Sequence, residues 1–240
     1  MGRILKTDLY RTFHGLAFYV FPAALLLILI LSLTLGDAAG MTMSVEGILE
    51  DTFVTARYLT FMPLGFLVTY LWNTETRNGF IKNIAGNVTG RHIPAVTKLV
   101  TGALITVIYM IITIGFMLVG NLMNGYTIVW GDPGRSIVKL GLWILIGMAF
   151  VALMELVHEL THSAALGYIL TIAIWTGMVE ELILNIVALI DSKIDLIGYT
   201  LINGMLIEDR LWVSLIRTIV YLAVFAVLAV FTAKKRDVKA

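Results

Sequence analysis

Six long apolar stretches dominate this sequence of 240 residues. A helix that crosses a lipid bilayer needs about 20 mostly apolar residues, and each stretch satisfies that requirement. The stretches are residues 16–35, 53–72, 99–120, 137–157, roughly 164–190, and 211–232. We therefore expect an all-α, polytopic membrane protein with six transmembrane helices in a single domain, residues 1–240.

The composition supports this class. Hydrophobic residues make up 59% of the chain and charged residues 14%, whereas about 25% of a soluble domain is charged. The 17 basic and 16 acidic residues nearly balance, so no basic surface for nucleic acid is expected. The absence of cysteine excludes disulfides and cysteine nucleophiles. The first apolar stretch is longer than the 7–15 residues of a signal peptide, so we interpret it as a retained span.

Lysine and arginine placement predicts the orientation. These residues are enriched in the cytoplasmic loops of membrane proteins. Eleven of them flank the ends of the spans on one side, namely Arg3, Lys6, Arg11, Arg77, Lys82, Arg91, Lys98, Lys234, Lys235, Arg236 and Lys239. Only Arg135, Lys193 and Arg210 lie on the other side. The sequence therefore predicts a plasma-membrane protein with both termini in the cytoplasm.

Three segments between or before the spans have patterns of their own. In residues 1–15, Leu5, Leu9 and Phe13 recur at helical spacing, which favours a helix lying in the inner membrane interface, or else an ordinary basic flank. In residues 73–98, a short helix with an apolar face is expected, suited to a cytoplasmic partner or to the membrane surface. Residues 191–210 are too apolar for a solvated loop and predict a re-entrant or extracellular helix.

A family resemblance rests on the loop after the second span. Its sequence runs Glu75-Thr-Arg77-Asn-Gly79-Phe80-Ile81-Lys82-Asn83-Ile84 and continues through Gly90-Arg91 to Lys98. This pattern resembles the loop between spans two and three of ABC-2-type transporter permeases. The segment from Lys6 to Arg11 is similar to the family's N-terminal interfacial helix, and Ala164-Ala-Leu-Gly167 is similar to the start of its fifth span.

The resemblance implies a transport subunit. Two permease subunits, identical or different, would pair around a pathway, and two ABC ATPase subunits carrying ATP and Mg²⁺ would drive them. Residues 75–84 would be the coupling helix that seats in the ATPase, with Glu75, Arg77, Gly79, Phe80, Ile81, Lys82, Asn83, Ile84 and Arg91 at that contact. The chain has no G-x-x-x-x-G-K-[ST] phosphate loop, so we expect no ATPase activity, catalytic residue, cofactor or metal in it. The expected cargo is amphipathic, such as an antimicrobial or toxin peptide.

An alternative function comes from His158-Glu159-Leu-Thr-His162. In H-E-x-x-H on a helix, two histidines share a face and can bind zinc, while the glutamate activates water. That pattern is typical of a metalloprotease, here an intramembrane one. A catalytic zinc also needs a third protein ligand, and Asp191 and Asp195 lie beyond the next predicted span. A polar turn between spans four and five is the competing interpretation.

Ionisable residues within spans are costly and are usually paired or functional. Arg57, Glu180, Glu181 and Arg217 lie at similar predicted depths, toward the outer ends of spans two, five and six. They predict a buried ion-pair cluster near an outer gate. Alternatively, each arginine extends to the interface independently.

Overall fold

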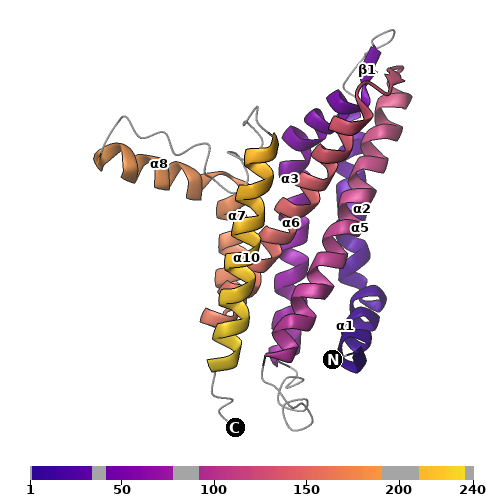
Figure 1. Ribbon diagram of the computed structural model, residues 1–240. Coiled ribbons are helices and arrows are strands. Elements are labelled where there is room, and N and C mark those ends of the chain that lie inside the picture. Colours follow the sequence, from indigo (N-terminus) through magenta and orange to yellow (C-terminus); the bar gives the residue numbers. More distant parts are fainter. Residues whose placement is uncertain (1, 34–41, 78–91, 191–210, 236–240) are drawn as a thin grey trace.

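The computed structural model describes residues 2–33, 42–77, 92–190 and 211–235, and these form an elongated set of helices (Figure 1). In chain order the helices are α1 (Gly2–His14), α2 (Leu16–Leu33), α3 (Val45–Arg77), α5 (Ile93–Met123), α6 (Pro133–Thr161), α7 (Ala164–Trp175), α8 (Met178–Ile190) and α10 (Leu211–Lys235). Strands β1 (Thr42–Ser44) and β2 (Thr127–Val129) pair in parallel, with Met43 opposite Ile128. This short ribbon joins the segments that precede α3 and α6.

Several helix ends follow from local sequence. The carboxylate of Asp132 accepts hydrogen bonds from the backbone N–H groups of Gly134 and Arg135, and Pro133 opens α6, where its missing N–H costs nothing. Ser163 caps α7 in the same way through the N–H of Leu166. Asp132 and Pro133 therefore determine where α6 begins.

Three helices are long and apolar enough to cross a membrane in the part of the chain that the structure describes, and they are α5, α6 and α10. They coincide with the third, fourth and sixth predicted stretches. Helices α2 and α3 coincide with the first two. The prediction of a largely helical chain with apolar helices long enough to cross a membrane is confirmed, and the number of six spans stays a prediction.

The fifth predicted stretch, 164–190, is not one continuous helix. Helix α7 ends at Trp175, Gly177 adopts a left-handed φ of +80°, and α8 begins at Met178. Figure 1 shows α8 leaving the bundle at a steep angle to α7 and α10. A helix of 12 residues is about 18 Å long, whereas a bilayer core is about 30 Å thick. The predicted fifth span is interrupted at Gly177, because a glycine can adopt the left-handed conformation that ends a helix without steric strain.

Residues 73–77 and 93–98 of the predicted loop are helical, which corrects its expected bounds. Helix α3 continues past the second apolar stretch to Arg77, and α5 starts at Ile93, where Pro94 fits the first helical turn. Glu75 and Lys98 are therefore helical residues that face other helices. The segments 78–91 and 191–210 lie outside the described residues.

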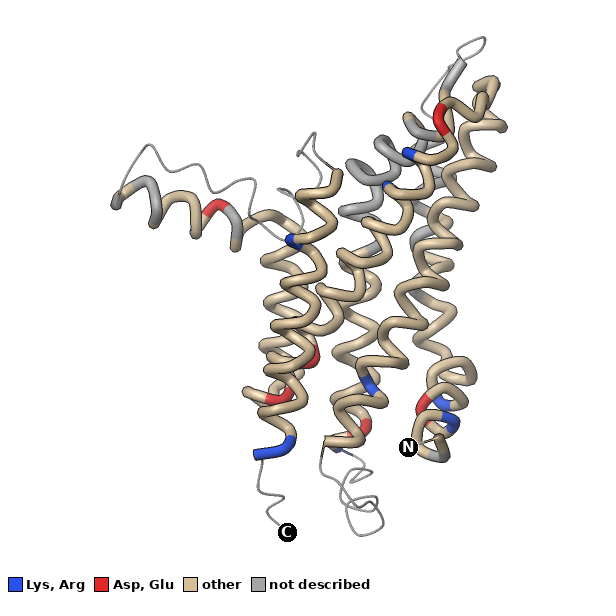
Figure 2. The backbone as a smooth tube through the Cα atoms, in the orientation of Figure 1, with Lys and Arg blue, Asp and Glu red and all other residues tan. Residues whose placement is uncertain are grey.

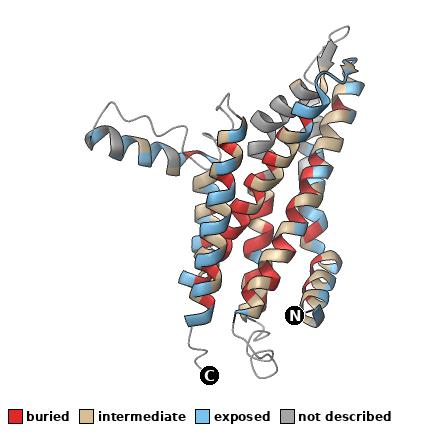
Figure 3. Ribbon diagram, viewed as in Figure 1, coloured by how far each residue is buried: buried red, intermediate tan, exposed pale blue. Residues whose placement is uncertain are grey.

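The core runs between α3, α5 and α6 (Figure 3), where the largest buried side chains include Trp143, Phe61 and Phe150. Close helix approach depends on small residues. A Cβ on Gly65 would lie 2.5 Å from Thr171, and one on Gly167 would lie 2.7 Å from Thr69. This reciprocal pairing joins α3 to α7.

The same pattern joins α5 to α6. A Cβ on Gly102 would lie 2.3 Å from Val151, and one on Gly147 would lie 2.5 Å from Thr106. At both interfaces, each helix has a glycine followed four residues later by a β-branched residue. The glycine of one helix faces the β-branched residue of the other. Small residues at four-residue spacing let membrane helices pack through van der Waals contact, because lipid supplies no hydrophobic driving force between them.

Candidate functional site: a buried charge cluster at the base of the bundle

Four helices bring ionisable side chains together at one end of the bundle. Helix α1, the last turns of α3 and α6 and the first turns of α5 meet there, and charged residues gather at this end in Figure 2. We call this end the base. The base cluster consists of Asp8 and Arg11 on α1, Glu75 on α3, Lys98 on α5, and Glu155 and Glu159 on α6.

Lys98 is the centre of the cluster. Its side chain is 2% exposed, and its Nζ lies 3.6 Å from Glu159 Oε1 and 3.8 Å from Glu155 Oε1. The ammonium group also lies 5.8 Å from the centroid of the Trp72 ring, within cation–π range. One buried cation therefore faces two buried carboxyl groups and an aromatic wall.

Helix α1 closes the cluster from the side. Its most buried residues are Asp8 and Thr12, one helical turn apart, while Leu5, Leu9 and Phe13 are only half-buried. Arg11 Nη1 lies 3.7 Å from Glu75 Oε1. The predicted helix is present, but the face that it turns toward α3 and α5 is the polar one. The reason is that Glu75 and Lys98 offer charged partners there.

Burial changes the proton affinity of the carboxyl groups beside α1. Desolvation raises the pKa of Asp8 above its ordinary value, although a hydrogen bond with Thr97 and the charges of Arg11 and Lys98 oppose the shift. Glu75 lies one turn beyond the apolar stretch 53–72. Desolvation raises its pKa to about 7, against the lowering effects of Lys98 and Arg11. Glu75 therefore titrates near neutral pH.

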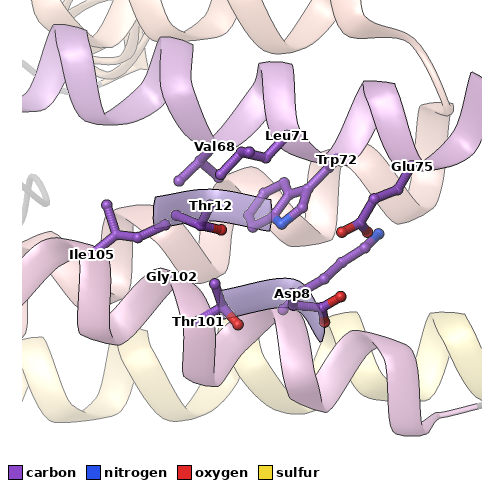
Figure 4. A pocket seen from close by; sticks show the side chains of 10 residues that line it. Asp8, Thr12, Val68, Leu71, Trp72, Glu75, Thr101, Gly102 and Ile105 are labelled. Atoms are coloured by element: carbon purple, nitrogen blue, oxygen red, sulfur yellow. The ribbon is translucent and has the colours of Figure 1, made fainter. Parts of the chain in front are cut away.

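Two cavities flank Glu75. The larger, about 130 Å³, lies between α1, the start of α2, and α3, and is lined by Asp8, Arg11, Thr12, Gly15, Ala17, Phe18, Tyr70, Leu71, Thr74 and Glu75. The smaller, about 10 Å³, lies deeper, between Glu75, Lys98, Trp72 and Thr101. In Figure 4 the carboxyl groups of Asp8 and Glu75 approach the smaller cavity from α1 and α3. Both cavities have polar side chains in their walls beside apolar ones and can hold water.

The H-E-x-x-H motif lies at the edge of this cluster. Helix α6 ends at Thr161, and His162 is its left-handed C-cap, with φ of 54°. His158 Nε2 lies 3.2 Å from Thr76 Oγ1, and Glu159 faces Lys98. Within the described ranges, no three His, Cys, Asp or Glu side chains are grouped to hold a metal ion. The structure thus gives Glu159 and His158 packing partners within the helix bundle, whereas the zinc-binding pattern needs a helix that continues through both histidines.

The predicted coupling residues are described only in part. Glu75 points inward to Arg11, while Arg77, two residues later, is exposed at the end of α3. Gly79, Phe80, Ile81, Lys82, Asn83, Ile84 and Arg91 lie outside the described residues. Their contact with an ATPase stays a prediction.

The predicted outer ion-pair cluster is likewise untested. Glu181 is exposed on α8, which leaves the bundle, and Arg217 is half-buried on α10. The side chains of Arg57 and Glu180 lie outside the described set. At the base, Arg11 pairs with Glu75, and Lys98 pairs with Glu155 and Glu159.

The base cluster was not predicted from the sequence, because Lys98 was assigned to a loop and Glu155, within a span, was weighed only as a conceivable zinc ligand. A signal was present. Glu155 and Glu159 are four residues apart, so they share one face at the end of the fourth stretch. The partner cation could not be identified, because it comes from another helix.

No protein-family model matches this chain, and no curated protein matches it. The resemblance to ABC-2-type permeases therefore stays a prediction from the sequence pattern described above.

Proposed function

We propose that this chain is the membrane subunit of an ATP-driven exporter, working with a second permease copy and two separate ATPase subunits. Three long apolar helices supply a membrane domain. The pattern in residues 75–98 resembles a permease coupling loop. The chain carries no phosphate loop of its own, so the energy source would be a partner.

The main support for the proposal is that the helix ends on both sides of segment 78–91 form ion pairs with other helices of the bundle. On one side, Glu75 near the end of α3 pairs with Arg11 of α1. On the other side, Lys98 near the start of α5 pairs with Glu155 and Glu159 of α6. A force applied to segment 78–91 would therefore be transmitted to α1, α3, α5 and α6 together. Such a linkage is what a coupling loop requires.

The substrate class follows from the helix surfaces. The long helices expose mainly apolar side chains, such as Ile111 on α5, Ile137 on α6 and Val227 on α10. A pathway formed between two such subunits would be largely apolar. It suits an amphipathic or hydrophobic cargo, and we favour a peptide with antimicrobial or toxin character over a sugar or an ion.

Single-cysteine variants test the proposal, because the chain contains no cysteine. Arg77→Cys lies at the end of α3, and Met123→Cys, which is also exposed, lies at the opposite end of the bundle and serves as the matched control. In intact cells, an impermeant maleimide should label Met123→Cys and leave Arg77→Cys unlabelled. A bifunctional reagent should then crosslink Arg77→Cys, and not the control, to a subunit with ATP hydrolysis activity.

Two results would refute the proposal. The first is labelling of Arg77→Cys from outside the cell. The second is purification of the full chain from its native membrane without any nucleotide-hydrolysing subunit, under conditions that keep the bundle folded by circular dichroism.

A further inference from the structure

Glu155 is the most isolated ionisable group in the base cluster. Its side chain is 0% exposed, and no nitrogen or hydroxyl donor among the described residues hydrogen-bonds to its carboxyl oxygens. The nearest cation, Lys98 Nζ, is 3.8 Å away, beyond hydrogen-bond distance, and lies closer to Glu159. An ionised carboxylate in such a place is strongly unfavourable, because burial removes its water and the side chain within hydrogen-bonding reach, Glu159, is a second acid that offers no donor while it is ionised.

The charges around Glu155 do not compensate for a second ionised acid. Lys98 of α5 supplies one positive charge, which Glu159 shares, and Glu75 of α3 adds another acidic group. His158 contacts Thr76. Helix α10 turns Ala229 and Ala233 inward, and the described residues of α7 and α10 contribute no charged group that acts on Glu155. Among the described residues, one cation thus faces two acids, which favours the neutral form of one of them.

We propose that Glu155, Glu159 and Lys98 form a proton-binding site in which Glu155 carries the proton at neutral pH, and that Glu75 exchanges this proton with water in the cavity beside α1. Glu159 remains ionised and pairs with Lys98, to which it is closer. Lys98 occupies the place that a metal cation would need, so the ligand of this site is a proton.

The cavities supply the route. The cavity of about 130 Å³ reaches Glu75 from the α1 side, and the cavity of about 10 Å³ continues from Glu75 to Lys98. The smaller one is about the size that one water molecule needs. Glu155 lines neither cavity, but Lys98 lines the smaller one and its Nζ lies 3.8 Å from Glu155 Oε1. On release, the Lys98 ammonium gives a proton through this water to the carboxylate of Glu75. The O–H bond of Glu155 breaks as its proton moves to the Lys98 nitrogen, so Lys98 is again an ammonium and Glu155 remains as a carboxylate. Glu75 then gives the proton to cavity water. A pKa of about 7 suits Glu75 to this exchange.

Proton release would alter the base of the bundle. Once ionised, Glu155 competes with Glu159 for Lys98 and places a second negative charge beside Glu75. The contacts that hold α1, α3, α5 and α6 together at the base would weaken. Proton occupancy therefore sets how firmly these helices are joined, whether or not the chain is a transporter.

Infrared spectroscopy of the full chain in lipid nanodiscs tests the site. At pH 7 the wild-type protein should show the C=O stretch of a protonated carboxylic acid. Because Glu75 also titrates near pH 7, the spectra are compared in a Glu75→Gln background, where Glu155→Gln should remove this band and Glu155→Asp should shift it. Glu181→Gln, which changes an exposed acid on α8, should leave the band unchanged. A wild-type protein without the band, or a band that neither Glu155 variant alters, would overturn the proposal.

Hydrogen–deuterium exchange tests the route. After transfer to D₂O, the Glu155 band should shift rapidly in the wild type and about tenfold more slowly in Glu75→Gln, because a neutral amide cannot accept the proton. Arg77→Gln, an exposed change on the same helix, should exchange at the wild-type rate. If Glu75→Gln exchanges as fast as the wild type, Glu75 is not the exchanging group. Circular dichroism verifies that each variant is folded.

Discussion

Replacing Gly102 with alanine should separate helices α5 and α6. The added Cβ would lie 2.3 Å from Val151 Cγ1, so one side must move by about 1 Å to reach the 3.4 Å of an ordinary contact. Val151 is buried and β-branched, with little rotamer freedom to adapt. Overpacking of this kind typically costs about 1–3 kcal/mol. Alanine also favours a helix over glycine by up to about 1 kcal/mol, which offsets part of that cost.

A matched control isolates the contact. Gly115 lies on the same helix, and a Cβ there meets nothing within 4 Å, so Gly115→Ala should be neutral or slightly stabilising. The two variants should therefore differ by about 1–3 kcal/mol in unfolding free energy. Detergent-driven unfolding in mixed micelles, followed by circular dichroism, measures this difference. Val151→Ala combined with Gly102→Ala should cost less than the sum of the single changes, because the new methyl group fills the vacated space. Equal stability of Gly102→Ala and Gly115→Ala would refute the close-packing argument.

Three further predictions concern charge. Lys98→Met should destabilise the protein by about 3–5 kcal/mol in the same unfolding assay, because it leaves buried acids without their cation, and adding Glu155→Gln should recover part of the loss. Stability should fall as pH rises from 4.5 through about 7, by up to about 1.4 kcal/mol per pH unit, because folded Glu75 binds its proton more tightly than the unfolded chain does; Glu75→Gln should flatten a urea-denaturation profile in this window. If Glu181 and Arg217 interact, Glu181→Ala and Arg217→Ala should each impair assembly, measured by size-exclusion chromatography, and the double variant should be less impaired than their sum, whereas strict additivity would exclude the pair.

Much of the helical layout could be predicted from the sequence. The apolar stretches of α5, α6 and α10 are continuous, and a run of that length forms a helix in lipid because no other structure satisfies its backbone hydrogen bonds. The break at Gly177 was harder to predict, because the residues on both sides of it are apolar and hydropathy alone cannot distinguish one long helix from two. The ends of α3 and α5 were also misplaced, since polar residues such as Glu75 and Lys98 were assigned to the loop.

By itself, the sequence determined the class of protein: apolar length and low charge specify helices suited to a membrane, whatever their arrangement. Only the tertiary structure decided which charges meet. Asp8, Glu75, Lys98 and Glu155 are separated by tens of residues in the chain, and each alone reads as a flank, a loop or an isolated acid within a span. They become one cluster because close packing at Gly102 and its counterparts sets how the helices align. Electrostatic energy depends on the distance between charges and on their burial, and neither can be predicted from the order of the residues alone.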